Sequence, residues 1–210
     1  MIDRVYLINL DCRPERLESA KLEISKSLIL KKYQKIAAID GQKLTDQDVK
    51  PYVTEEGYRD IVANRPTKGL YLSYGGVALA ITYQKLLSKC NHNMLILEDD
   101  IIVHKNFDKM LAPSLSELPA NWDILYLGWY QSPHLKIIPI SEHINRLDGQ
   151  VNGTQAWIVN PNSAKKICDL FPISYQIDSE IYNSKNLVKY STKMPIITRN
   201  LKHTSDIQSY

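Results

Sequence analysis

The sequence lacks the features that would place it in several simple functional classes. It has only three cysteines, Cys12, Cys90 and Cys168, an odd number without CxxC spacing. This arrangement predicts neither a disulfide framework nor a zinc site, and we interpret all three as reduced thiols. No apolar run approaches the roughly 20 residues that a membrane-spanning helix needs. Asp3 and Arg4 stand where a signal peptide would build its apolar region, so we expect a cytoplasmic protein.

Common catalytic and binding motifs are also missing. None of the five histidines has HExxH spacing, and no Walker-type glycine loop or GxGxxG fingerprint is present, so zinc protease, kinase and dehydrogenase functions lose their support. The net charge of +3 is too small to indicate nucleic acid as a partner. Only the stretch from Lys185 to His203 is locally basic. It would suit an anionic substrate or a peripheral membrane contact, or form a solvated surface.

The remaining composition predicts one globular domain, since 44% of the 210 residues are apolar and 23% are charged. "RVYLINL" predicts a buried strand, a helix follows from Pro14, and "YQKIAAID" predicts a second strand. Leu17, Ala20, Ile24 and Leu28 repeat at helical spacing. This β-α-β opening implies a parallel pair of strands.

The middle of the chain predicts short helices and a long loop over 45–69, a helix in "GGVALAITYQKLLSK", a strand at 94–97, a helix from 106 to the approach of Pro113, and a strand in "WDILYLG". The later part predicts loops or a hairpin over 129–153, a strand in "TQAWIVN", a helix after Asn160, a short helix in "QIDSEIYNS", and strands in "LVKYST" and "MPIIT". Alternating strands and helices favour an open α/β sheet with helices on both faces. Ligands gather at the carboxyl ends of such strands, so the residues after Asn9, Ile39, Leu97 and Leu127 should share one rim.

Three adjacent acids, Glu98, Asp99 and Asp100, follow the strand "MLIL" at this rim. Like charges repel, so either a solvated turn or a positive partner is expected among them. Carboxylates at the mouth of a sheet suit Mg²⁺ or Mn²⁺, and strand alternation makes Glu98 and Asp100 the pair that could cooperate. Capping of the following turn is the alternative.

Six motifs together resemble glycosyltransferase family 25, the lipooligosaccharide and procollagen galactosyltransferase family. They are "VYLINLDCRPER", "AAIDG", "LILEDDI", "DILYLG", "GTQAWIVNPNSAKKI" and "PISYQIDSEI". Their order and spacing carry the resemblance from about Val5 to His203. It implies a glycosyltransferase A-type, Rossmann-like open mixed sheet with helices on both faces, in a single domain whose nucleotide-sugar half covers about 1–128 and whose acceptor half covers about 129–210.

The resemblance also implies a set of site residues. Leu10, Arg13 and Arg16 would lie near the nucleotide, Asp40 beside its base or ribose, and Glu98 or Asp99 at the ribose or a coordinated water. Asp100 and His203 would bind Mn²⁺ (or Mg²⁺). Asp178 is the candidate catalytic base, with Glu180 as the alternative, although both could simply stabilise a helix start.

One departure from the family pattern stands out. The family usually has Ser-His where "SYGGVALAI" places Ala80 and Ile81, and the loss could alter specificity or weaken activity. Five aromatic residues could stack on a base or sugar, although a core role is common for such side chains. They are Tyr71, Tyr74, Trp129, Tyr130 and Trp157.

These inferences predict an inverting, metal-dependent glycosyltransferase. It would move a hexose, with galactose as one candidate, from a UDP-sugar to a glycan, lipid-linked glycan or glycoprotein, which fits a role in lipopolysaccharide biosynthesis. A non-catalytic nucleotide-sugar or glycan-binding module is the alternative, and a metal-dependent phosphohydrolase is a third class. The donor sugar, the linkage and the oligomeric state stay open.

Overall fold

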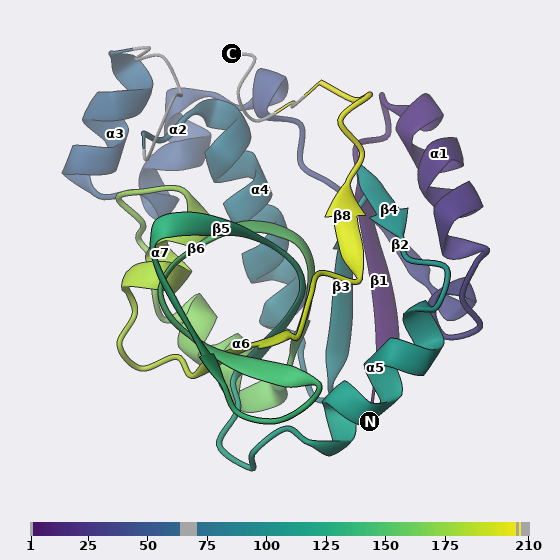
Figure 1. Cartoon of the computed structure of the whole chain (residues 1–210). Helices are drawn as coiled ribbons and strands as arrows, with labels where there is room; N and C mark the ends of the chain where they lie inside the picture. The colour runs from purple at the N-terminus through teal and green to yellow at the C-terminus, as the bar shows by residue number, and fades with distance from the viewer. Residues whose placement is uncertain (1, 64–70, 205, 207–210) are drawn as a thin grey trace.

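A computed structural model describes residues 2–63, 71–204 and 206 of the chain (Figure 1). Within these residues the strands are β1 (Arg4–Asn9), β2 (Gln34–Ala37), β3 (Met94–Glu98), β4 (Ile101–Val103), β5 (Ile124–Pro139), β6 (Ile144–Val159), β7 (Lys189–Thr192) and β8 (Ile197–Arg199). The α-helices are α1 (Pro14–Ile24), α2 (Asp46–Val49), α3 (Glu55–Val62), α4 (Tyr74–Leu87), α5 (Phe107–Ser116), α6 (Pro161–Cys168) and α7 (Ile177–Asn183). Short 3₁₀ turns cover Leu30–Lys32, Gly41–Lys43 and Lys50–Tyr52. Part of the predicted loop, 64–70, lies outside the described residues.

The main sheet is mixed and has the strand order β2-β1-β3-β6-β5-β7. β1 pairs in parallel with both β2 and β3, which confirms the β-α-β opening. β6 runs antiparallel to β3 and to β5, so the first half of β5 has the direction of the parallel strands. The expected α/β class, mixed sheet and single domain are confirmed.

Both faces of the sheet are covered by helices. The side chains of β1 alternate between the two faces and show which helices cover each one. Val5 and Leu7 pack in one core cluster with side chains of α1 and α5. Tyr6 and Ile8 pack in the other with side chains of α4, α6 and α7. Figure 1 shows the same division, with α1 and α5 on one side of β1 and β3 and α4 on the other.

Two helix boundaries differ from the predictions. Leu28 lies beyond α1 and is 74% exposed, so its assignment to the apolar stripe was wrong. Helix α5 continues through Pro113 to Ser116. Burial of Leu111 and Ser114 anchors the helix on both sides of the proline, and the Ser114 hydroxyl donates to the carbonyl of Met110 at 2.9 Å. Tertiary packing therefore outweighs the local cost of the proline.

The region 129–153 forms the outer part of a long hairpin between β5 and β6, one of the two predicted alternatives. Each strand has 16 residues. The hairpin curls (Figure 1), and β7 pairs with the beginning of β5 on one side and the beginning of β6 on the other. The β5–β6 register shifts on both sides of Gly128, as in a β-bulge.

A second, two-stranded sheet brings the late part of the chain beside the acidic motif. β8 pairs antiparallel with β4, which follows directly after Asp100, and Ile101 is paired with Arg199. The residues after β8 therefore begin at the same rim as the carboxyl ends of β1 and β3 (Figure 1).

Candidate active site

The carboxyl ends of the parallel strands open onto a pocket of about 270 Å³. Residues after β1 and β2, the three acids and Tyr130 of β5 all line it, which confirms the predicted common rim. The sequence-predicted residues that line it are Leu10, Arg16, Asp40, Glu98, Asp99, Asp100 and Asp178. Arg13, Glu180 and His203 are not among the lining residues.

Glu98 ends β3 and is held from two sides. Its Oε1 accepts hydrogen bonds from the Tyr83 hydroxyl of α4 at 2.8 Å and from the Thr154 hydroxyl of β6 at 2.6 Å. Burial, reinforced by the negative charge of Asp100, raises the pKa of Glu98 to about 7. Burial also raises the pKa of Tyr83 well above its usual value, so its phenol stays protonated and able to donate.

Arg16 is the positive partner that the acid triplet requires. It projects from the first turns of α1 and is only 6% exposed. Arg16 pairs with Asp99, and its Nη2 lies 3.6 Å from Oδ2 of Asp100. Asn9 Nδ2 donates to the other oxygen of Asp99 at 2.7 Å. Burial raises the pKa of Asp99, and the contacts with Arg16 and Asn9 oppose the rise.

Asp100 is held by β8, a connection that no sequence pattern suggested. Arg199 Nε donates to Oδ2 of Asp100 at 2.8 Å. The backbone N–H of Asn200 donates to the Asp100 carbonyl at 2.6 Å. The Oδ1 atom of Asp100 is buried and has no partner among the described residues. One carboxylate oxygen is thus neutralised while the other is available.

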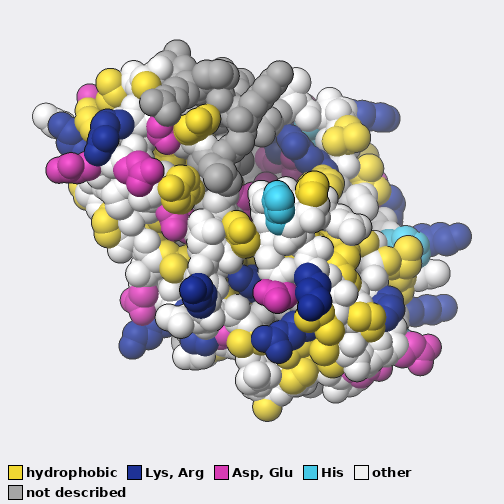
Figure 2. Space-filling view, turned by 60° about the vertical axis from the view of Figure 1, so that its left-hand side comes forward, with side chains coloured by type: hydrophobic (Ala, Val, Ile, Leu, Met, Phe, Trp, Pro, Cys, Tyr) yellow, Lys and Arg dark blue, Asp and Glu magenta, His cyan; other side chains and the backbone are white. Residues whose placement is uncertain are grey.

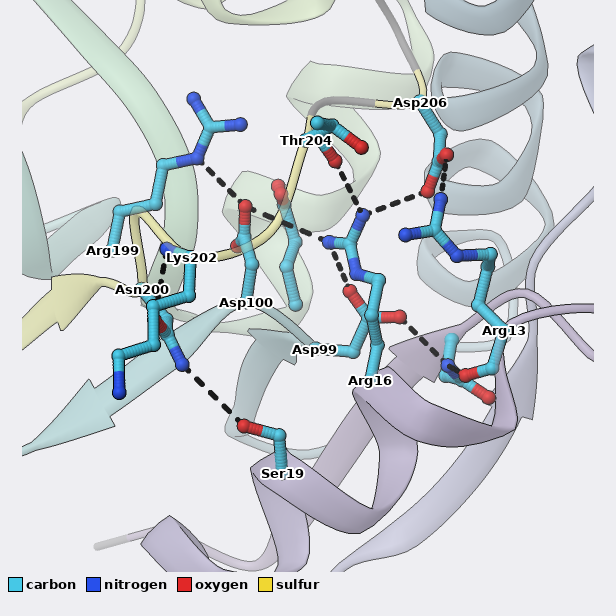
Figure 3. A network of polar contacts seen from close by, with 12 residues as sticks. Arg13, Arg16, Ser19, Asp99, Asp100, Arg199, Asn200, Lys202, Thr204 and Asp206 are labelled. Atoms are coloured by element: carbon cyan, nitrogen blue, oxygen red, sulfur yellow. Dashed lines mark hydrogen bonds and ion pairs between the residues drawn. The ribbon is translucent and has the colours of Figure 1, made fainter.

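Residues 200–204 and 206, here called the late segment, pass over α1 (Figure 3). The Asp206 carboxylate bridges the two predicted nucleotide-binding arginines. Arg16 Nη1 donates to its Oδ2 at 2.7 Å, and Arg13 Nη1 donates to its Oδ1. Arg13 also pairs with Glu15 at 2.5 Å. An internal carboxylate therefore neutralises both guanidinium groups in the free protein.

Asp178 and Glu180 both lie in the first turn of α7 but contact different groups. Asp178 lines the pocket, where its Oδ2 accepts from the backbone N–H of Gly153 at 3.3 Å. Glu180 Oε1 accepts from the backbone N–H groups of residues 174 and 175 at 2.6 and 2.8 Å. Glu180 therefore stabilises the turn before α7, and the geometry favours Asp178 as the carboxylate that faces a substrate.

Leu10 directly follows β1, Asp40 lies three residues after the end of β2, and both line the pocket. Asp40 Oδ1 accepts from the backbone N–H of Gln42 at 3.0 Å and so caps the 3₁₀ turn at Gly41–Lys43. A Cβ at Gly41 would lie 2.7 Å from the Cα of Gly75. Glycine therefore lets the start of α4 approach the pocket at this point.

A metal site was predicted at Asp100 and His203. His203 lies in the late segment, and its Nε2 is buried without a partner among the described residues. In the described ranges no three His, Cys, Asp or Glu side chains gather around one point. A hard cation that keeps water and phosphate ligands needs few protein ligands, and carboxylate oxygen and imidazole nitrogen are both suitable donors. The two free atoms fit such an ion chemically, and the metal itself stays a prediction.

The pocket concentrates unpaired polar atoms. Of eight buried side-chain nitrogen and oxygen atoms that lack a partner in the described structure, four belong to lining residues: Asn9 Oδ1, Arg16 Nε, Asp100 Oδ1 and Gln155 Nε2. Buried polar groups in folded proteins are nearly always hydrogen-bonded. Their concentration here indicates a surface formed for a polar ligand.

The residues that replace the family's Ser-His pair lie elsewhere. Ala80 and Ile81 are buried in the core around α4, and neither lines the pocket. Of the five aromatic residues considered for stacking, Tyr130 is among the lining residues, whereas Trp157 packs edge-on against Tyr83 in the core.

Comparison with known families decides what kind of protein carries this pocket. The sequence profile of glycosyltransferase family 25 (LPS biosynthesis protein) matches residues 2–181. The chain belongs to glycosyltransferase family 25. It is therefore a glycosyltransferase, with a sugar donor and a glycan acceptor in general terms. The match reaches from β1 into α7, so it includes the three acids and Asp178. The comparison with curated proteins gives no match.

The basic stretch of this family 25 glycosyltransferase is not a continuous solvated surface. Lys189 is 7% exposed, and its Nζ donates to the carbonyls of Tyr182 at 3.0 Å and Ile181 at 3.3 Å at the end of α7. Arg199 binds Asp100. On the described part of the face in Figure 2, acidic and basic side chains are interspersed. Among the described helices, none has the length and apolarity needed to cross a bilayer.

Proposed function

We propose that this glycosyltransferase moves a hexose from a UDP-sugar to a hydroxyl group of a glycan, with inversion and with a divalent cation bound. The observation that carries the proposal is the composition of the pocket, which joins the buried Arg16 to the acid triplet at the end of β3. Four buried polar atoms of its lining, including one of Arg16 and one of Asp100, have no partner among the described residues. A nucleotide sugar offers a diphosphate for the cationic groups and hydroxyls for the polar ones. The acceptor is a glycan, a lipid-linked glycan or a glycoprotein, and galactose is one candidate sugar.

The arginine pair provides the expected diphosphate contacts. A guanidinium group binds phosphate oxygens in a two-pronged geometry, and burial strengthens the attraction. Arg16 and Arg13 are at present joined by the Asp206 carboxylate, so the donor diphosphate would take the place of that carboxylate. Glu98, whose pKa lies at about 7, can either donate to or accept from a ribose hydroxyl.

The chemical step needs one base. The acceptor oxygen attacks the anomeric carbon, the bond from that carbon to the diphosphate oxygen breaks, and its electron pair leaves with the UDP. The hydroxyl proton passes to a carboxylate, which we assign to Asp178 because it lines the pocket and its helix faces β6. A divalent cation, held by Asp100 and His203, would stabilise the charge on the departing diphosphate.

No observation at the pocket favours the non-catalytic alternative. That hypothesis was motivated by the loss of the Ser-His pair, and Ala80 and Ile81 lie in the core. A phosphohydrolase would need a nucleophilic Asp-x-Asp arrangement, which the sequence does not contain beside the acids.

Thermal unfolding with a panel of UDP- and GDP-sugars, with and without Mn²⁺ or Mg²⁺, tests the proposal. A ligand present at about 100 times its Kd adds about 2.7 kcal/mol to the free energy of unfolding, which raises Tm by about 5–10 °C at this chain length. We expect at least one UDP-sugar to stabilise the protein, more strongly with the cation. Absence of any stabilisation contradicts the proposal, and stabilisation without turnover on any acceptor supports the binding module.

A further inference from the structure

Gln155 is a buried side chain on the pocket wall that no other role explains. It lies in β6 and is 3% exposed. It lines the pocket, yet its Nε2 has no hydrogen-bond partner among the described residues. Leaving a buried amide unpaired is costly, and the cost is removed if a bound molecule completes the hydrogen bond.

The position of this amide is fixed by two glycines. A Cβ at Gly128 would lie 3.0 Å from Cγ and 3.1 Å from Nε2 of Gln155. A Cβ at Gly153 would lie 3.3 Å from its Cδ and closer still to its Oε1. Gly153 also has φ of +92°, a conformation that favours glycine. The β5–β6 register shifts beside Gly128, and such bulges redirect side chains next to binding sites. The backbone on both sides thus leaves a slot for the Gln155 side chain.

The neighbours of Gln155 indicate what it can bind. Gly153 contacts Asp178 through its backbone N–H, and Thr154 donates to Glu98. Asp178 and Glu98 have no guanidinium partner among the described residues, so this wall repels a phosphate group. The acids on the arginine side are paired with guanidinium groups. Of the guanidinium groups proposed to bind the diphosphate, Arg16 belongs to α1 and Arg13 directly precedes this helix. Arg199 also lines the pocket and is paired with Asp100. An amide both donates and accepts hydrogen bonds, which matches a hydroxyl group.

We propose that Gln155 binds a hydroxyl group of the sugar that is transferred and thereby discriminates between donor sugars. The inference rests on the proposed function, since it places the sugar of the nucleotide donor between the arginine side and Asp178. A site that pairs a buried amide with a substrate hydroxyl rejects a sugar whose hydroxyl points elsewhere, because the amide is then left unpaired. Gln155 is a specificity residue in this account, and Asp178 keeps the role of base.

The test compares wild type with Gln155→Met and Gln155→Leu, which replace the amide by an apolar side chain of similar size. Calorimetry measures the Kd of UDP and of the UDP-hexose that stabilises wild type most. We expect the Kd of the UDP-hexose to rise about tenfold and that of UDP to change less than twofold. Preference over the epimeric UDP-hexose should fall by a similar factor. Gln150→Leu, on the same strand but outside the pocket lining, is the matched control.

The stability of the ligand-free variants gives a second readout. Replacing an unpaired buried amide by an apolar side chain should leave Tm unchanged or raise it. A clear fall in Tm for both variants would show that the amide supports the fold and would overturn the inference. An equal loss of affinity for UDP and UDP-hexose, no loss of affinity for either, or a loss of affinity for the acceptor alone would also overturn it. Failure of wild type to bind any UDP-sugar would instead reject the proposed function.

Discussion

Replacing Asp206 by asparagine should weaken the fold and strengthen anion binding at the same time. The Asp206 side chain is 16% exposed and bridges Arg13 and Arg16. Its carboxylate neutralises the guanidinium groups that a donor diphosphate needs. Removing the charge therefore removes a stabilising contact and an internal competitor together, so the two effects have opposite signs.

The magnitude follows from the partners that remain. Arg16 keeps Asp99 and Arg13 keeps Glu15, so neither guanidinium becomes an isolated buried charge. Hydrogen bonds to charged groups contribute about 1.5–3 kcal/mol, and partial exposure reduces this. We expect the free energy of unfolding to fall by about 1–2 kcal/mol, which lowers Tm by about 2–8 °C at this chain length. The same free energy corresponds to about 5- to 30-fold tighter binding of pyrophosphate or UDP.

Thermal unfolding of the free protein and calorimetric titration with pyrophosphate at fixed ionic strength measure the two effects. Asp148→Asn makes the same change of charge at an exposed position of β6, without a contact to either arginine, and serves as the control. Lower stability accompanied by equal or weaker anion binding would refute the idea that Asp206 competes with a diphosphate for the arginine pair.

Three further changes probe the other site residues. Asp178→Asn should leave the Kd of the donor within about twofold and reduce transfer about 10²- to 10⁴-fold, and unchanged transfer would remove Asp178 from the base role. Folding raises the pKa of Glu98 from 4.5 to about 7, so the folded state holds this proton more tightly. The metal-free protein should therefore lose stability as pH rises from 4.5 to about 7. Urea titrations at pH 5 and 8 should show that Glu98→Gln abolishes this loss of stability, and identical profiles for the variant and wild type would contradict it. His203→Ala should raise the Mn²⁺ concentration needed for half-maximal turnover, and an unaltered Mn²⁺ dependence would exclude His203 as a ligand.

The position of the acids could be predicted from the sequence because it depends on local rules. A short apolar run followed by polar residues indicates a strand end, and parallel strands end at a common rim. Leu10, Asp40, Glu98, Asp99 and Asp100 therefore fall on the pocket as expected. The same rules predicted most of the strands and helices, since each of those elements carries its own periodicity, but they did not predict β4.

The contacts that neutralise the acids could not be predicted in this way. Arg199 reaches Asp100 across 99 residues of sequence, and Asp206 reaches Arg16 across 190. The sequence around each of these residues does not distinguish it from a solvated surface charge. Their positions depend on the pairing of β8 with β4, a non-local property of the fold.

The position of Gln155 on the pocket wall could not be predicted from its local sequence pattern. Within "TQAWIVN" it occurs as an ordinary residue of a strand. Its burial beside the pocket depends on Gly128 and Gly153 and on the bulge in the facing strand. The outer hairpin was equally hard to assign, because its few buried apolar residues are widely spaced along polar arms. They are Trp129, Leu135, Ile144, Leu147 and Val151.

Mn²⁺-dependent release of UDP from a UDP-hexose, measured for wild type and for Asp100→Asn, tests the central claim most directly. The substitution keeps the shape of the side chain and its contact with Arg199 but removes the charge proposed to hold the cation. The account predicts steady release of intact UDP by wild type and a loss of about 10²-fold or more in the variant. Release of UDP at the same rate by both proteins, or release of inorganic phosphate in place of UDP, would contradict it.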